Sequence, residues 1–224
     1  MSINSENEEI SGIMNRLLDK LALTSSSQVG AAGFVIRSQI GDMRSFYSDY
    51  LRDKTFSEKL LLIFTTAREA NAKLSSFVAV REQLFSEVPV GEISKLIVQV
   101  TIGFCLASES RIISNIEFTS RDDVEATIVS MKIAFDTARE LAADAIDSAS
   151  YQDLTFLAGA LTSHLAATAR PLPRMVTFNL AAPLPALALS NRIYYKGDRA
   201  EEIVAENHII HPAFCPREIR GLAS

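Results

Sequence analysis

Two histidines and a cysteine near the C-terminus are the residues whose types and spacing could do chemistry. His208 and His211 lie three positions apart, and Cys215 follows four positions later. Imidazole nitrogen and thiolate sulfur are ligands that zinc prefers, and a structural zinc site usually needs four of them in a tetrahedral array. A fourth ligand is not evident, and His211 precedes a proline. The pattern therefore favours a plain structural role for these residues, with a metal-dependent enzyme as the alternative.

Other polar residues are weaker candidates for a catalytic site. Asp122 and Asp123 could be imagined as a catalytic carboxylate pair, but neighbouring positions on a helix point about 100° apart, and capping of a helix explains both. His164 lies beside an apolar helical stripe, whereas a general base needs a reacting proton within reach. No nucleophile-elbow serine, phosphate-binding glycine loop or metalloprotease His-Glu pair is present in the sequence. We therefore expect no enzymatic activity and no cofactor.

Helical periodicity dominates the chain as far as Ala169. Apolar residues recur at spacings of three and four, which is typical of helices with one buried face. Thr55 and Glu58 have the spacing of a reciprocal capping box, and Ser150 with Asp153 is expected to cap a later helix. Pro89 separates two helices. The expected helices are 8–23, 31–52, 56–87, 92–113, 123–145 and 150–169.

The clearest periodicity begins after Asp123, where apolar residues alternate steps of four and three. This pattern predicts a helix packed along its length at a shallow angle. Helix 92–113 is apolar on several sides, which predicts a central position. The sequence thus predicts a mainly α fold, a bundle of five or six long helices. The repeating residues are Val124, Ile128, Met131, Phe135, Ala138, Ala142 and Ala145.

The C-terminal segment is punctuated by prolines. Pro171 and Pro173 end the last long helix, and residues 175–179 can then run extended. Pro185 suits the start of a short helix that Tyr194 and Tyr195 close. Asp198 is expected to cap a second short helix, 199–206. We therefore predict three regions: an N-terminal helix and hinge, 1–28; a helical bundle, 29–169; and a small mixed docking segment, 170–224.

Four motifs in this half of the chain stand in a distinctive order. They are Phe118-Thr119-Ser120-Arg121-Asp122-Asp123-Val124-Glu125-Ala126, Leu172-Pro173-Arg174, Leu184-Pro185-Ala186-Leu187 followed by Arg192-Ile193-Tyr194, and Asn207-His208-Ile209-Ile210-His211-Pro212-Ala213-Phe214. Their order resembles the C-terminal end of the DNA circularisation protein family of Mu-like tailed phages. The resemblance covers roughly residues 115–216. Residues 1–114 resemble that family only in being helical.

The resemblance implies a structural component of a contractile phage tail, at the baseplate end of the tail tube. Its partners would be the hub, the tail tube and the tape-measure protein, and several copies would close into a ring. The protein would be made in the bacterial host cytoplasm and end in the virion tail. Aromatic residues with an Arg rim are typical of protein interfaces. The residues expected to dock or to shape the docking segment are Arg174, Tyr194, Tyr195, Asn207, His211 and Phe214.

The charge pattern bears on the rival function, direct binding or joining of phage DNA ends. A net charge of −5 argues against broad attraction to phosphates, so we expect no nucleic-acid partner. Basic residues do concentrate in the C-terminal region, where we expect them to be solvated or paired with nearby glutamates. The basic residues are Arg170, Arg174, Arg192, Lys196 and Arg199, and the acidic ones are Glu201, Glu202 and Glu206.

Composition also bears on the compartment. The longest apolar run, 96–107, is interrupted and too short to span a bilayer, and residues 1–9 lack a basic signal-peptide start. We therefore expect neither a membrane span nor a secretion signal. Cys105 and Cys215 do not form a disulfide framework, which fits folding in a reducing cytoplasm.

Overall fold

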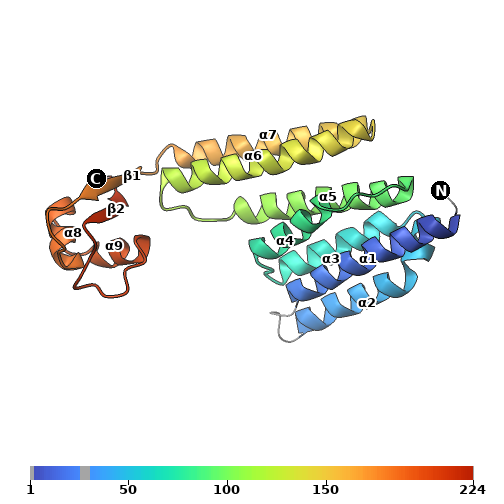
Figure 1. The fold of residues 1–224 in the computed structure, drawn as a ribbon, viewed down its shortest axis with the longest axis horizontal. Coiled ribbons are helices and arrows are strands. Elements are labelled where there is room, and N and C mark those ends of the chain that lie inside the picture. Colours follow the sequence, from blue (N-terminus) through green and yellow to red (C-terminus); the bar gives the residue numbers. More distant parts are fainter. Residues whose placement is uncertain (1–2, 26–30, 224) are drawn as a thin grey trace. The chain divides into compact units, whose positions relative to one another are not determined.

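The computed structural model describes residues 3–25 and 31–223 (Figure 1). These residues form nine helices and one two-stranded antiparallel sheet, so the prediction of a mainly α fold with a small mixed C-terminal segment is confirmed. The chain divides into two compact units. We call Met1–Ile116 with Ser130–Thr162 the N-terminal unit, and Glu117–Val129 with Ser163–Ser224 the C-terminal unit.

Five helices begin the N-terminal unit: α1 (Ile3–Ser25), α2 (Ala31–Arg52), α3 (Phe56–Glu69), α4 (Leu74–Phe85) and α5 (Glu92–Ile113). The predicted stripe of α1 is buried from Ile10 to Leu21, and α1 contacts α2, α4 and α5. The first helix therefore packs on its own chain. Residues 26–28 of the predicted hinge lie outside the described residues.

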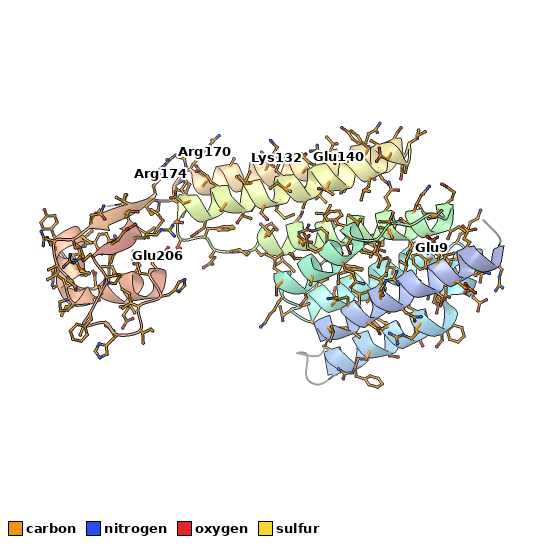
Figure 2. All side chains as sticks on the ribbon, in the orientation of Figure 1. Glu9, Lys132, Glu140, Arg170, Arg174 and Glu206 are labelled. Carbon is orange, nitrogen blue, oxygen red and sulfur yellow. The ribbon has the colours of Figure 1, made fainter. Side chains whose placement is uncertain are left out.

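Polar contacts fasten α1 to the segment before α5. The Glu9 carboxylate (Figure 2) accepts hydrogen bonds from the backbone N–H groups of Val90 at 2.7 Å and Gly91 at 2.9 Å. The Arg16 guanidinium donates two hydrogen bonds to the Glu87 carboxylate, at 2.7 and 2.6 Å. These contacts fix the position of the chain where Pro89 separates α4 from α5.

The centre of the N-terminal unit is α5, as its many apolar sides predicted. It contacts α1, α3 and α4, and its Cys105 thiol is fully buried. By length and composition α5 is the one described helix that could cross a membrane. Of its most apolar window, 56% is buried inside the protein, which is typical of a core helix.

The single helix predicted at 56–87 is wrong, because the chain breaks between α3 and α4. Asn71 takes the left-handed conformation, with φ of 60°. The N–H of Ala72 donates to the Ala67 carbonyl at 3.0 Å, and that of Asn71 to the Arg68 carbonyl at 2.9 Å. This pair of bonds is the Schellman ending of a helix, at which asparagine is one of the favoured residues. The predicted capping box is also wrong, since Thr55 makes no side-chain cap bond.

Two long helices follow, α6 (Arg121–Asp144) and α7 (Ser148–Ala169), and both contribute residues to each unit. A short turn joins them at one end, and the Arg121 N–H donates to the Pro173 carbonyl at 2.9 Å at the other, so they run antiparallel. The predicted stripe of α6 is buried at five of its positions. Ile128 is half-buried, and Ala145 is exposed because it lies beyond the helix end.

The starts of α6 and α7 are capped differently from one another. Ser120 and Asp123 form a reciprocal pair: the Asp123 N–H donates to Ser120 Oγ at 3.1 Å, and Ser120 Oγ donates to the Asp123 carboxylate at 2.6 Å. For α7 the predicted cap at Ser150 is wrong. Asp147 is the cap, accepting a bond from the Ser150 N–H at 3.1 Å, because the helix already begins at Ser148.

The C-terminal unit contains β1 (Met175–Asn179), α8 (Ala186–Tyr194), α9 (Ala200–Glu206) and β2 (Glu218–Leu222). The extended stretch, the helix after Pro185 and the end of α7 at Ala169 are confirmed, whereas β2 is an addition. Asp198 is not the cap of α9, whose N-cap residue is Arg199, without a side-chain cap bond. Figure 1 shows the strands beside the two short helices. Their shared core is Ala186, Leu189, Tyr194, Ile203, Cys215 and Ile219.

Candidate functional site

Tyr194 and Tyr195 are neighbours with opposite placements. Tyr194 is 8% exposed, and the Arg199 guanidinium lies 3.8 Å above its ring centroid. Burial raises the pKa of the Tyr194 phenol. Tyr195 ends α8 in the left-handed conformation, with φ of 57°, and its side chain is 91% exposed. Of the two predicted tyrosines, Tyr194 therefore shapes the unit and Tyr195 is free to contact a partner.

Asn207 joins the end of α9 to β2. Its amide oxygen accepts a bond from the Arg220 N–H at 2.6 Å, and its amide nitrogen donates to the Arg220 carbonyl at 2.7 Å. The same nitrogen donates to the Ile203 carbonyl at 2.9 Å. Three bonds from one side chain to backbone groups make Asn207 a shaping residue rather than a contact residue.

His211 and Phe214 lie together in the turn after α9. The His211 Nδ1 accepts a bond from the Ala213 N–H at 3.3 Å, and the His211 and Phe214 ring centroids are 5.4 Å apart. Phe214 is 73% exposed, and Ile210 in the same turn is fully exposed. Sequence reasoning missed Ile210 as a contact residue, although a large apolar residue outside any helix stripe is a readable signal.

An apolar groove opens between α8, α9 and this turn. Its volume is about 520 Å³, and Glu201 is the one charged residue of its lining. Most of the lining residues are small, so the groove can accept a bulky side chain from outside. Its apolar lining includes Ala186, Leu187, Val204, Ala205, Pro212 and Ala213. Leu187 is 59% exposed. We call Leu187, Tyr195, Ile210 and Phe214, with this groove, the apolar surface.

Basic side chains lie at the start of the C-terminal segment. Figure 2 shows Arg170 and Arg174 there. Arg174 is exposed and lies 3.7 Å from the Glu125 carboxylate. The basic residues were expected to be solvated or to pair with glutamates of α9. Arg199 does form such an ion pair, with two hydrogen bonds of 2.8 and 2.7 Å to Glu202. In the part of the chain that the structure describes, Arg170, Arg192 and Lys196 have no ion-pair partner.

The residues considered for metal or acid-base chemistry are not brought together. Among the described residues, no group of three or more His, Cys, Asp or Glu side chains could hold a metal ion. Cys215 is buried in the core, where desolvation raises the pKa of its thiol and so disfavours the thiolate. Asp122 does not cap α6 as expected, because its carboxylate accepts the Met175 N–H at 2.7 Å. His164 lies exposed on α7.

Comparison with protein families and with curated proteins adds no relative. No protein-family model matches the chain, and no curated protein matches it. The resemblance to the phage family therefore depends on the residue motifs themselves.

Proposed function

We propose that the protein is a structural assembly component that acts through protein–protein contacts of its C-terminal unit. The observation that carries the proposal is the apolar surface, on which Tyr195, Ile210 and Phe214 are 91%, 101% and 73% exposed. Large exposed apolar side chains and an apolar groove in one small unit are typical of binding surfaces, because water contact with apolar groups costs free energy that a partner relieves.

Some of these residues shape the unit and others are exposed for contact. Tyr194 and Asn207 hold the helices and strands of the unit in place, and Tyr195, Ile210 and Phe214 project from that frame. The guanidinium of Arg174 lies exposed, as rim residues of interfaces do. A partner would insert a side chain into the groove and bury the projecting rings, the usual anatomy of an interface core.

The assembly we propose is the baseplate end of a contractile phage tail. The motif resemblance supports it, since the Leu-Pro-Ala-Leu motif forms the start of α8 and the Asn-to-Phe motif contains Ile210 and Phe214. In this proposal the partners are the hub, the tail tube and the tape-measure protein. Several copies form a ring in the virion tail, and the protein performs no reaction and uses no cofactor.

The proposal is tested by complementing a phage that lacks the gene with the double variant Tyr195→Ser/Phe214→Ser. We expect the titre of infectious particles to fall by orders of magnitude, with tails stalled in assembly. The matched control is Phe156→Ser on α7, an aromatic residue that is 80% exposed outside the apolar surface. Its titre should stay at the wild-type level.

Full infectivity of the double variant would overturn the proposal. The two rivals have their own readouts with the purified chain. Salt-dependent retention on DNA would favour the DNA-joining function, with Arg170, Arg192 and Lys196 as the first residues to replace. Stoichiometric zinc would favour the metal-dependent enzyme. Genes for a tape-measure protein and a tail hub beside this one would support the tail assignment.

A further inference from the structure

The ladder between β1 and β2 determines which backbone groups point outward. The Leu180 N–H donates to the Arg217 carbonyl and the Ala223 N–H to the Arg174 carbonyl, both at 2.7 Å, at the two ends of the sheet. In the antiparallel register, Val176 pairs with Gly221 and Phe178 with Ile219. Because paired residues alternate between bonded and non-bonded positions, the even-numbered residues of β1 bond to β2. The amides and carbonyls of the odd-numbered residues therefore face away from it.

The outer edge of β2 is covered at its central residue, Arg220. The Asn207 amide bonds both the N–H and the carbonyl of Arg220, at 2.6 and 2.7 Å, as a neighbouring strand would. Glu218 and Arg220 also place charges on this strand. Covering an edge and charging it are the ordinary ways in which proteins prevent another strand from adding there.

The outer edge of β1 is open. Its first outward N–H, that of Met175, donates to the Asp122 carboxylate at 2.7 Å. Over residues 3–25 and 31–223, the outward backbone groups of Thr177 and Asn179 have no hydrogen-bond partner, and both residues are exposed. Met175–Asn179 contains no charged residue and no proline. The edge that carries neither a charge nor a proline is thus the one with free backbone groups at Thr177 and Asn179.

We propose that β1 of a second copy of this chain adds antiparallel to this edge, centred on Thr177. The outward-facing residues Met175, Thr177 and Asn179 are placed symmetrically about Thr177, as a two-fold contact of a surface with itself requires. The two Thr177 residues exchange both of their N–H···O=C bonds. The Asn179 N–H of each copy meets the Met175 carbonyl of the other. The Asp122 carboxylate, which holds the Met175 N–H, ends the ladder there.

The side chains fit the same register. Val176 of each copy stands opposite Phe178 of the other, at a non-hydrogen-bonded position where cross-strand side chains are closest. An aromatic residue facing a β-branched one is a favourable pair. Val176 is 40% exposed in the single chain, so pairing covers an apolar side chain that is otherwise in water. The four-stranded sheet that results is stronger than an isolated two-stranded one.

This contact uses the β1 edge and not the apolar surface, so it does not depend on the proposed function. The experiment is sedimentation of the full chain over a range of concentrations. We expect a dimer that dissociates on dilution. Thr177→Pro removes the outward N–H without touching a bond to β2, and should weaken dimerisation at least about tenfold, because two interchain bonds are lost.

The matched control is Glu218→Pro, which removes an outward N–H from the first residue of the other strand. It should leave dimerisation unchanged. Circular dichroism and melting curves establish that each variant is folded. A wild-type chain that stays monomeric at every concentration would overturn the proposal, as would equal association of both variants, which would assign the contact to another surface.

A second measurement does not depend on proline. Thr177→Cys places two thiols opposite each other across the two-fold axis, with Cα atoms about 5.5 Å apart, within the range of a disulfide. We expect rapid covalent dimerisation under mild oxidation, and none for Glu218→Cys. The natural cysteines Cys105 and Cys215 are both buried, so background cross-linking is low. Equal cross-linking of the two variants would contradict the register.

Discussion

The two units of the chain keep their shape by different means. The N-terminal unit buries long helix stripes and an ion pair: Arg81, 6% exposed in its side chain, bonds to the fully buried Glu109 at 2.8 Å. In the C-terminal unit the two strands and two short helices share a core cluster of six buried residues, and backbone-directed contacts such as those of Asn207 complete it. Both units expose large apolar side chains, but the open strand edge and the apolar surface beside a groove belong to the C-terminal unit.

The largest difference between the two units is expected when the buried ion pair of the N-terminal unit is removed. Arg81→Met leaves the Glu109 carboxylate buried without its partner, and should lower the free energy of unfolding by about 3–5 kcal/mol. Urea denaturation measures this loss. Arg81→Met/Glu109→Leu should recover much of it, since no lone charge remains. A double variant no more stable than the single one would show that packing and not charge holds this site.

The same variant has a pH signature. Burial raises the pKa of the Glu109 carboxyl, and Arg81 partly offsets this. A carboxyl with a raised pKa in the folded state stabilises the protein at low pH and loses that contribution as pH rises through the folded value. Arg81→Met removes the offset, so its loss of stability should be larger at neutral pH than in acid.

In the C-terminal unit the corresponding test is Asn207→Ala. It leaves the N–H and carbonyl of Arg220 without partners, and should cost about 1–3 kcal/mol. Hydrogen exchange at β2 and α9 should quicken, while exchange in α5 stays unchanged. Unchanged exchange at β2 would mean that the shared core alone holds the strand.

The smallest effect is expected at the surface contacts of α1. The Arg16 guanidinium lowers the pKa of Glu87 from its ordinary value of 4.5, and the Val90 N–H does the same for Glu9. Their contribution is therefore present above the ordinary carboxyl pKa and is lost as pH falls through the lowered values. Glu87→Gln should cost at most about 1 kcal/mol, because Arg16 is half exposed. The melting temperatures of the variant and the wild type should therefore become equal as the pH is lowered.

Local patterns predicted most of the helical fold. The stripes of α1 and α6 are periodic along the sequence, so their buried faces could be read directly, whereas the apolar sides of α5 indicated only its central position. The break at Asn71 could not, because asparagine only permits a left-handed residue and a continuous apolar pattern disguised the turn. β2 was missed because its charges and its glycine are atypical of strands, and its pairing with β1 joins distant residues.

In the candidate site too, the sequence predicted some features and not others. The motifs marked Tyr194, Tyr195, Asn207 and Phe214, but not their separate roles. Those roles depend on which way the chain turns at Tyr195 and on where β2 runs, and both are results of tertiary packing. The Arg81–Glu109 pair joins α4 to α5 across 28 positions, and no local spacing marks it.

The two natural thiols report separately on the opening of the two units. Cys105 lies in the core of the N-terminal unit and Cys215 in that of the C-terminal unit, and both are completely shielded from reagents. Alkylation followed by peptide mass spectrometry would therefore time the opening of each unit in one sample, with no introduced label. Because the C-terminal core is so small, Cys215 should be modified first.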